Sequence, residues 1–511
     1  MIKSNGGIIG PDNVTTGGAF GRASGVFKLG EVTDLIKQSK WPTAGPGGFQ
    51  VANSARMNRG SSDYFRRTNN TAGTSDKIGT YSGWVKRSTV SLDGMFFEGK
   101  DLAANNYTQI YFQATGALTI YGSGGGMDLV TTALFRDPSA WYHVVVAFDT
   151  TQGTASNRVK VYVNGVQQTS FSTGTYLAQN ATIYFGVNGD QQGIGVREDG
   201  ALLWNGYMAE ICYVDGQALA PTSFGETNSQ TGIWVPKAVT GLTFGNNGCY
   251  LDFKNASNLG NVVAGNSTDF TENGLTSLDQ STDTCTTNFA TLNPLALRNN
   301  PNAYYAVLSQ GNLKLKGNAT TNNGNSFSTM AFDTGKWYCE VKMIDADNSL
   351  FPILGVIPED LAASANSPSN SGQIGTVGSD TVGYSPDGQK IIAGNETSYG
   401  DTFTNNDIIG IAIDCDNGAV YFSKNGTFQA SGDPTSGASK TGAALTFTPS
   451  KTYFFGASVY KDTNDIEFNF GSPTFAISSG NTDGNGFGNF EYAVPTGYLS
   501  LNTKNLAAVL A

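Results

Sequence analysis

The sequence predicts an all-β protein built from two antiparallel β-sandwich (jelly-roll) domains, and three features support that fold. Glycine accounts for 65 of the 511 residues and aromatic residues for 11% of them, so residues suited to turns and to strands are both abundant. Apolar and polar residues alternate over many short segments, which is typical of strands with one buried face. Asn-Gly pairs follow several of these segments, and this dipeptide is a strong indication of a β-hairpin.

The first sandwich is predicted at residues 51–225, where strand-like segments follow one another without helical segments between them. These segments are residues 81–87, 107–113, 117–121, 141–149 and 158–163. Asn164-Gly165 comes directly after the last of them and predicts a tight hairpin. The regular spacing indicates a sandwich rather than a mixed α/β domain.

The second sandwich is predicted at residues 301–485. Its clearest strand-like segments are residues 335–341, 407–414 and 419–424. Asn417-Gly418 and Asn425-Gly426 predict the turns that flank the last of these. Between the two sandwiches, residues 226–300 are rich in Asn, Thr, Ser and Asp and are expected to be an irregular connector. Residues 486–511 form a C-terminal tail, whose apolar end is expected to pack.

The N-terminal residues 1–50 are rich in Gly and Pro and form a segment too short for a core of its own. A helix is expected only at residues 30–39, where Thr33 or Asp34 would cap its start and Trp41-Pro42 would end it. Two interpretations stay open for residues 1–50. They form an extended arm that docks on a partner, or a flexible leader that packs on its own domain.

Charge and cysteine content exclude several classes of function. Lys and Arg number 30 against 41 Asp and Glu, so the net charge is −11, and no basic run is present. Phosphate recognition needs clustered Lys and Arg, so nucleic acid is not expected as a partner. The five cysteines are far apart and indicate neither a disulfide framework nor a zinc site. No segment approaches the about 20 apolar residues that cross a bilayer, so membrane insertion is not expected.

Two groups of segments resemble known domain families. The first group resembles the laminin-G-like branch of the concanavalin-type jelly rolls and comprises residues 141–149, 160–166 and 204–211. The second group resembles the SPRY domain and comprises residues 335–341, 383–388, 406–410, 421–426 and 469–475. The resemblance implies two non-enzymatic sandwiches whose binding surfaces are formed by loops at one edge.

The combination of these domains resembles virion proteins of tailed phages, particularly those of marine bacteria and cyanobacteria. The connector segments 269–271 and 288–294 and the closing segment 495–502 carry this resemblance. It implies a chain made in the host cytoplasm and released by lysis, which agrees with an N-terminus that has no secretory h-region. Residues 1–50 would then bind other virion proteins, and a homo-oligomer, as a trimer, is expected.

Catalytic chemistry is not expected from the candidate residues. The sole histidine, His143, lies within an apolar strand, where packing is the simpler explanation than a base for a Ser or Cys nucleophile. Paired carboxylates could hydrolyse a glycan. However, no strand carries the alternating Glu residues of concanavalin-type glycosidases, and Arg197-Glu198-Asp199 is typical of a solvated turn.

Binding residues are harder to predict. The run from Asp414 to Gly418 superficially resembles a calcium loop, but it lacks the flanking helices and distant Glu of an EF-hand, so a hairpin is expected there. Laminin-G-like domains often bind calcium at the sandwich rim, which leaves calcium open for oxygen-rich loops such as Asn188-Gly189-Asp190. Tyr399 is the most plausible aromatic residue in a loop and is a weak ligand-binding candidate, against core packing as the simpler alternative.

Three functions are therefore considered. The first is a virion tail fibre, spike or capsid-attached fibre that presents two sandwiches to host-surface glycan or protein. The second is a purely architectural decoration or adaptor subunit. The third is a polysaccharide-degrading enzyme. Glycan binding favours the first, loss of particle integrity without loss of adsorption favours the second, and release of sugar fragments favours the third.

Overall fold

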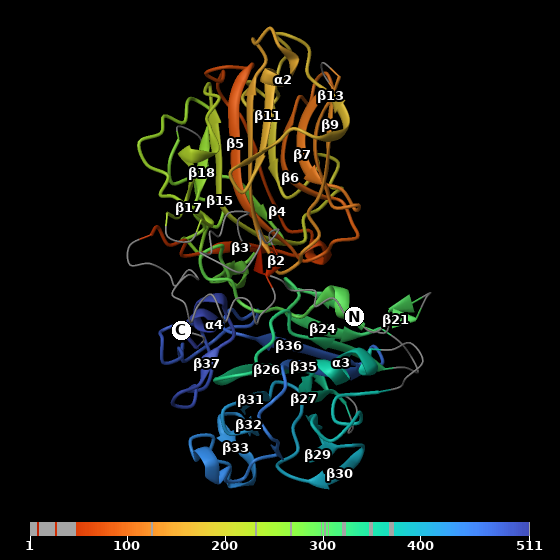
Figure 1. The fold of residues 1–511 in the computed structure, drawn as a ribbon. Helices are drawn as coiled ribbons and strands as arrows, with labels where there is room; N and C mark the ends of the chain where they lie inside the picture. The colour runs from red at the N-terminus through yellow and green to blue at the C-terminus, as the bar shows by residue number, and fades with distance from the viewer. Residues whose placement is uncertain are drawn as a thin grey trace. The chain divides into compact units, whose positions relative to one another are not determined.

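The computed structural model describes residues 48–509 and the paired segments β1 (Ile8–Ile9) and β2 (Val26–Phe27). Gaps in the described range are residues 124–125, 230–231, 266–267, 298, 301–302, 305, 319–322, 347–350 and 367–371. The helix expected at residues 30–39, and nearly all of the expected arm 1–50, lie outside the described residues. The chain forms two compact units (Figure 1). The described part of the first domain is residues 48–287 with β1 and β2, and that of the second domain is residues 288–509.

The first domain is a sandwich of two antiparallel sheets, as the strand pattern predicts. The back sheet runs in the order β12 (Val166–Gln168), β11 (Val159–Val163), β10 (Trp141–Asp149), β5 (Ile78–Arg87), β15 (Gly206–Asp215), β3 (Ser54–Met57) and β20 (Gln280–Ser281), with β18 (Cys249–Leu251) on β15. The front sheet runs in the order β13 (Phe171–Thr175), β9 (Met127–Leu134), β8 (Ala117–Gly122), β7 (Tyr107–Phe112), β6 (Gly94–Lys100), β14 (Gln191–Ile194), β4 (Tyr64–Thr68) and β19 (Thr271–Asn273). The hairpin of β16 (Gly225–Thr227) and β17 (Trp234–Pro236), the short helix α2 (Ala155–Arg158) and the 3₁₀ turns η1 (Arg59–Ser61), η2 (Pro221–Ser223) and η3 (Ser277–Asp279) complete the domain.

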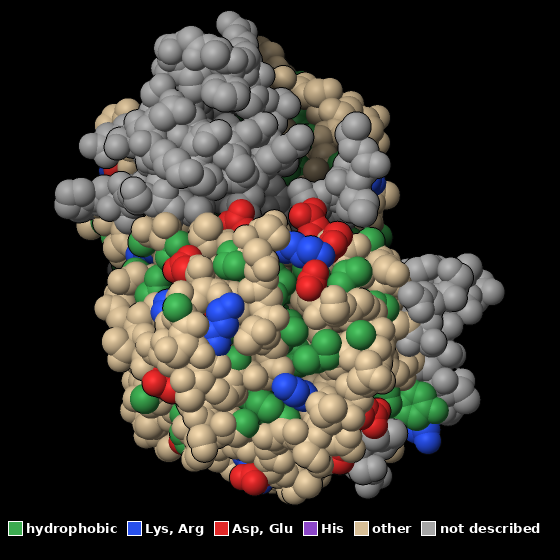
Figure 2. Space-filling model, turned by 60° about the horizontal axis from the view of Figure 1, so that its bottom comes forward, with side chains coloured by type: hydrophobic (Ala, Val, Ile, Leu, Met, Phe, Trp, Pro, Cys, Tyr) green, Lys and Arg blue, Asp and Glu red, His purple; other side chains and the backbone are tan. Residues whose placement is uncertain are grey.

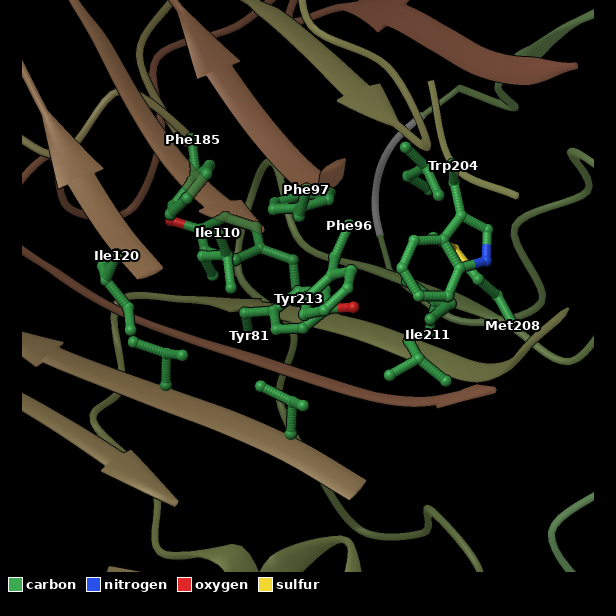
Figure 3. Packing of buried hydrophobic residues seen from close by; sticks show 14 of the residues in the cluster. Tyr81, Phe96, Phe97, Ile110, Ile120, Phe185, Trp204, Met208, Ile211 and Tyr213 are labelled. Atoms are coloured by element: carbon green, nitrogen blue, oxygen red, sulfur yellow. The ribbon is translucent and has the colours of Figure 1, made fainter. Parts of the chain in front are cut away.

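Aromatic side chains dominate the core between these two sheets (Figure 3). Tyr81 of β5 stacks on Phe97 of β6 with ring centroids 5.3 Å apart. Phe97 also lies 4.9 Å from Phe185, and Trp204 meets Phe96 edge-on at 5.0 Å. Each such ring buries about 150–250 Å² of surface, so this cluster supplies much of the hydrophobic stabilisation of the sandwich.

The hairpin predicted at Asn164-Gly165 is confirmed. Both residues have positive φ, 49° and 78°, and Val163 pairs directly with Val166. This is the conformation of a two-residue type I′ turn, which Asn and Gly adopt at little cost. The Asn164 side chain also accepts a hydrogen bond from the backbone N–H of His143 at 2.8 Å, so the turn is tied to the neighbouring strand β10.

Residues 226–287 belong to the first domain, whereas the sequence indicates a connector over 226–300. They add β18 and β20 to the back sheet and β19 to the front sheet. Phe253, Leu259 and Phe270 are buried in the main core cluster. These few apolar anchors are separated by polar loops, so the segment packs without showing a strand-like pattern.

A buried ion pair fastens the end of this segment to the back sheet. The Lys86 Nζ atom lies 2.8 Å from Asp283 Oδ2, and both side chains are 1% exposed. The Trp141 indole N–H donates to Asp283 Oδ1 at 3.2 Å, and the Ser54 hydroxyl donates to the Asp283 carbonyl at 2.6 Å. The first domain is therefore closed by a polar contact between residues far apart in sequence.

The second domain is also a sandwich of two sheets. The larger sheet runs in the order β23 (Ala306–Ser309), β24 (Lys314–Gly317), β36 (Asn464–Asn469), β26 (Lys336–Ala346), β31 (Ile408–Asp414), β32 (Ala419–Lys424) and β33 (Thr427–Phe428), with β34 (Leu445–Thr446) on β32 and β37 (Leu499–Ser500) on β26. The smaller sheet runs in the order β25 (Asn323–Phe327), β35 (Tyr453–Tyr460), β27 (Ile353–Pro358), β28 (Val382–Tyr384), β29 (Gln389–Ile392) and β30 (Asn395–Ser398). The remaining elements are β21 (Asn299–Asn300), β22 (Ala303–Tyr304), α3 (Glu359–Ala365), α4 (Thr503–Val509), η4 (Pro294–Ala296), η5 (Gln429–Ser431) and η6 (Gly437–Ser439).

The two turns around β32 differ from each other. Asn425-Gly426 forms the predicted two-residue turn, with φ of 48° and 81° and Lys424 paired with Thr427. Asn417-Gly418 instead ends a four-residue loop, because Asp414 pairs with Ala419. The Asp414 carboxylate holds that loop by accepting the backbone N–H groups of residues 416 and 417 at 3.1 and 2.9 Å.

The C-terminal tail completes the second domain. The apolar end packs as expected, since Leu506 and Ala507 of α4 are buried, and Tyr498 is fully buried against the larger sheet. The carboxylate of Glu340 on β26 accepts the backbone N–H groups of Glu491 and Tyr492 at 3.0 and 2.8 Å. Residues 486–509 are therefore part of the sandwich.

The surface of the second domain that faces the viewer in Figure 2 is mostly uncharged, with acidic and basic side chains scattered among polar and small apolar ones. No helix within the described residues is long and apolar enough to span a membrane.

Candidate functional site

Polar and aromatic side chains line the outer face of the front sheet in the first domain. Side chains alternate between the two faces of a strand, so Ile110 and Ile120 point into the core while their neighbours point outward. The strand register places Glu98 of β6 opposite Gln109 of β7, and Gln109 opposite Tyr121 of β8. Residues from three strands thus meet in one row across the sheet.

Two tyrosine rings form the flattest part of this face. Tyr107 and Tyr121 are half-buried and stacked, with centroids 5.9 Å apart and ring planes 26° apart. The Lys100 Nζ atom lies 5.0 Å from the centroid of the Tyr107 ring. Burial, and then the neighbouring Tyr121, raise the pKa of Tyr107, so the Tyr107 hydroxyl stays protonated at neutral pH. The rings offer an apolar surface with polar edges.

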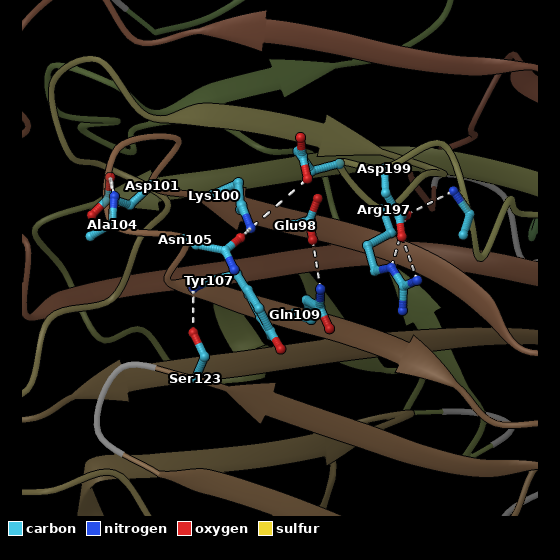
Figure 4. A network of polar contacts seen from close by, with 12 residues as sticks. Glu98, Lys100, Asp101, Ala104, Asn105, Tyr107, Gln109, Ser123, Arg197 and Asp199 are labelled. Carbon is cyan, nitrogen blue, oxygen red and sulfur yellow. Dashed lines mark hydrogen bonds and ion pairs between the residues drawn. The ribbon is translucent and has the colours of Figure 1, made fainter.

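Glu98 lies beside the tyrosines and is nearly inaccessible, with 2% of its surface exposed. Its Oε1 atom accepts a hydrogen bond of 2.6 Å from the Gln109 side-chain amide (Figure 4). Burial raises the pKa of Glu98 from 4.5 to about 7, against a smaller lowering by Gln109. A large fraction of Glu98 therefore carries a proton at neutral pH and can donate a hydrogen bond.

The loop between β14 and β15 forms a wall beside Glu98. Arg197 and Asp199 make a two-point ion pair within this loop at 2.9 and 2.6 Å (Figure 4). The Arg197 hydrogen bond is the main cause that lowers the pKa of Asp199 to about 2. Arg66 of β4 donates to the carbonyls of Arg197 and Glu198, both at 3.0 Å. The wall is thus bound to the sheet by backbone contacts, whereas the sequence predicts only a solvated turn at residues 197–199.

This arrangement suits recognition of a neutral sugar better than its cleavage. Tyrosine rings cover the apolar face of a pyranose, while Glu98 and Gln109, which are 2% and 5% exposed, bind each other beneath the surface. Cleavage would need an accessible acid and a second carboxylate flanking the same bond. Glu98 is covered, and the neighbouring Glu198 lies 3.9 Å from the Lys100 ammonium, so neither group is free for that role.

His143 is buried in the back sheet, as packing predicts, and its hydrogen bonds oppose a role as base. It stacks on Trp84 with centroids 4.7 Å apart, and the indole N–H of Trp234 donates to its Nδ1 atom at 2.9 Å. Because Nδ1 accepts, Nε2 carries the proton and donates to the Ser82 hydroxyl at 2.9 Å. His143 cannot take the Ser82 proton in this state, and burial lowers its pKa to about 3.

Tyr399 follows β30 and packs toward the core of the second domain. Its ring meets Tyr384 and Phe422 edge-on at 5.7 and 6.1 Å. The hydroxyl donates to the Gly442 carbonyl at 3.3 Å, and burial raises the pKa of Tyr399 to about 12. Tyr399 is half-buried, and these contacts hold its ring against the core of the second domain.

The loops considered for calcium differ in their contacts. The Asp414 carboxylate binds backbone N–H groups and lies 2.9 Å from the Lys336 ammonium, so its oxygens serve the hairpin loop. Asp190 is 4% exposed, and burial, with a smaller contribution from Asp101, raises its pKa to about 6. Within the described ranges, no three His, Cys, Asp or Glu residues gather as metal ligands would.

The sequence interpretation missed the Glu98, Gln109, Tyr107 and Tyr121 face. Residues 107–113 are predicted as a strand, and its alternate residues Tyr107, Gln109 and Tyr111 share one face by the period of two. That pattern indicates an outer face with aromatic and amide groups. It does not reveal Glu98, because only the register between β6 and β7 brings Glu98 and Gln109 together.

Family models match both domains. Residues 59–217 match the model described as the concanavalin A-like lectin/glucanases superfamily, of laminin-G type. Residues 336–473 match the SPRY domain. The chain is therefore a two-domain β-sandwich protein of the binding-module class. More particularly, a laminin-G-like, concanavalin-type domain comes first and a SPRY domain follows it.

Solved structures with similar folds are distant in sequence. The chain is 13% identical to the SPRY domain of human HERC1 over 35% of this chain and 96% of that one, with a TM-score of 0.27. It is 16% identical to a heptameric SAP-like pentraxin from Limulus polyphemus over 34% of this chain and 80% of that one, with a TM-score of 0.24. It is 15% identical to a candidate carbohydrate binding protein from Bacteroides ovatus over 34% of this chain and 46% of that one, with a TM-score of 0.25. Among curated proteins, none matches the chain.

Proposed function

We propose that this chain is a non-enzymatic virion protein of a tailed phage, such as a tail fibre, spike or capsid-attached fibre, which binds host-surface glycan. The observation that carries the binding role is the half-exposed pair Tyr107–Tyr121 beside Gln109 and Glu98 on the outer face of the front sheet. Partly exposed aromatic rings that can stack on the apolar face of a sugar are a usual feature of a sugar site.

The virion role rests on the sequence. The order of a laminin-G-like domain and a SPRY domain, with connector segments 269–271 and 288–294 and the closing segment 495–502, resembles virion proteins of tailed phages. Residues 1–50 are proposed to anchor the chain to other virion proteins. A weak sugar site suffices in such a particle, because many copies that bind one surface together raise the avidity.

The binding role is tested by removing the two rings. The double variant Tyr107→Ala with Tyr121→Ala is expected to weaken glycan binding by the full chain about tenfold or more, since two stacking contacts are lost and every 1.4 kcal/mol is a factor of ten. Binding is first mapped on a glycan array and then measured by titration with the best glycan.

The matched control is Tyr162→Ala, which removes a half-buried tyrosine from the back sheet of the same domain. This control is expected to bind as the parent chain does. Unchanged glycan binding in the folded double variant would reject the front-sheet site. If the chain is found in intact particles but binds no glycan, the architectural subunit is favoured. If the chain releases sugar fragments, the polysaccharide-degrading enzyme is favoured.

A further inference from the structure

Both sheets of the first domain end on consecutive strands. The chain leaves β11, forms the edge strand β12 of the back sheet and then crosses to β13, the edge strand of the front sheet. Within the described residues, β12 pairs only with β11, and β13 pairs only with β9. The outward backbone N–H and C=O groups of these two strands therefore point away from their own sheets, and such groups accept a further strand.

The edge strands β12 and β13 carry none of the charged side chains that usually protect an edge strand. Residues 161–189 contain no Asp, Glu, Lys, Arg or Pro, and both strands lie within this range. Val166 of β12 is 64% exposed. Some edge strands do carry charge, since β19 contains Glu272 and β30 contains Glu396. Charge and proline on an edge oppose pairing with another chain, and β12 and β13 have neither.

We propose that the partner of this edge is a second copy of the same chain, which pairs along β13 about a two-fold axis and gives a dimer in place of the trimer expected from the sequence. A bulge separates Phe171 from Thr173, so the regular part of β13 is residues 173–175. Antiparallel pairing about Gly174 places Thr173 of one copy opposite Thr175 of the other, and cross-strand Thr pairs are favourable. Gly174 has only one atom near its missing Cβ, the Phe171 Cβ at 3.9 Å, so the second backbone can approach closely.

The charge of the chain favours the edge formed by β12 and β13 as the contact surface between two copies. Each chain carries a net charge of −11, so two copies repel each other over most orientations. The range 161–189 contains no charged residue, so it adds no like charge at a contact between copies. Pairing through one strand also gives a closed, isologous contact, the commonest type in homo-oligomers. The inference stands independently of the proposed glycan site, although a dimer would present two front sheets to one surface.

The experiment measures the mass of the full chain by light scattering and analytical ultracentrifugation across a concentration series. A dimer of twice 53.8 kDa is expected for the parent chain. The double variant Thr173→Lys with Thr175→Lys is expected to raise the dissociation constant at least tenfold, because four ammonium groups would meet at the edge. The control Thr397→Lys, on the exposed edge strand β30, is expected to leave the dimer unchanged.

A second measurement does not depend on a lysine variant that folds. Gly174→Cys is expected to form a disulfide between copies under mild oxidation, since the two-fold axis brings this position next to its symmetry mate. A monomeric parent chain at all concentrations would overturn the proposal. A trimer would overturn it too, as would a dimer that the double lysine variant leaves intact and that the Gly174→Cys variant does not cross-link.

Discussion

Asp283→Ala is expected to destabilise the first domain by about 3–5 kcal/mol, the usual cost of removing one partner from a buried ion pair. Both partners of the pair are shielded from solvent, because the Lys86 and Asp283 side chains are each 1% exposed. Their charged atoms lie 2.8 Å apart. Removal of the carboxylate takes away the Asp283 partner of the buried Lys86 ammonium and the acceptor of the Trp141 indole N–H. The end of the segment 226–287 should loosen first, because Asp283 ties it to β5 and β10.

The measurement is denaturant unfolding of the full chain followed by tryptophan fluorescence, with hydrogen exchange on β5 to assign the transition to the first domain. The matched control is Lys77→Ala. Lys77 pairs with Asp76 at 2.9 Å, but the two side chains are 33% and 45% exposed, so a loss of about 0.5 kcal/mol or less is expected. Asp283→Asn keeps an acceptor for Trp141 and should fall between the two. A loss below about 1 kcal/mol for Asp283→Ala would mean that the pair does not hold the domain closed.

The local turns could be predicted from sequence because their chemistry is local. The two-residue turns predicted at Asn164-Gly165 and Asn425-Gly426 form at those residues in the structure. Few other residues adopt positive φ twice in succession at low cost. Asn417-Gly418 carries the same dipeptide but a different loop. There the Asp414 side chain binds two backbone N–H groups and stabilises a longer turn, which a dipeptide rule does not describe.

The extent of the first domain could not be predicted because its closing contacts are long-range. Strands β18, β19 and β20 have two or three residues each, too few for a recognisable alternation. They are held by single side chains from distant parts of the chain. Arg67 donates to the carbonyls of Asn247 and Thr268 at 2.7 and 3.1 Å and lies over the Phe270 ring. Such contacts follow from the fold and leave no periodic pattern in the sequence.

The candidate site shows the same division between local and long-range information. The alternation Tyr107, Gln109, Tyr111 places aromatic and amide groups on one face of a predicted strand. The raised pKa of Glu98, by contrast, follows from burial beneath its neighbours and from the register between β6 and β7. Tyr399 is predicted in a loop, where it does lie, but its ring packs on the core. A residue's place in a loop therefore says little about its exposure.

The stability of the first domain is expected to fall as the pH rises from about 4.5 to 7. Burial is the largest cause that raises the pKa of both Glu98 and Glu210 from 4.5 to about 7. Glu98 lies on the front sheet beside Gln109, and Glu210 lies on the back sheet, where its carboxylate accepts the Tyr250 hydroxyl at 2.5 Å. Between about pH 4.5 and 7, Glu98 and Glu210 keep their protons in the folded state and lose them in the unfolded state.

The sign follows from proton linkage. A carboxyl group whose folded pKa is raised binds its proton more tightly in the folded state, so its contribution is fully present below about pH 4.5 and is lost as the pH passes about 7. At about 1.4 kcal/mol per pKa unit, each glutamate contributes on the order of 3 kcal/mol to this change. The free energy of unfolding should therefore decrease through the window and become nearly independent of these two groups above it.

The test compares the parent chain with Glu98→Gln and Glu210→Gln, by denaturant unfolding at intervals between about pH 4.5 and 8. Glutamine resembles the protonated acid in shape and hydrogen bonding, so each substitution should remove its share of the pH dependence and leave the stability at about pH 4.5 almost unchanged. Burial lowers the pKa of His143 in the same domain to about 3, and this group adds stability as the pH rises to about 6.5, so the test rests on the difference between each variant and the parent chain. A Glu98→Gln chain with the same pH dependence of stability as the parent would show that Glu98 ionises readily in the folded domain and is not a hydrogen-bond donor at neutral pH.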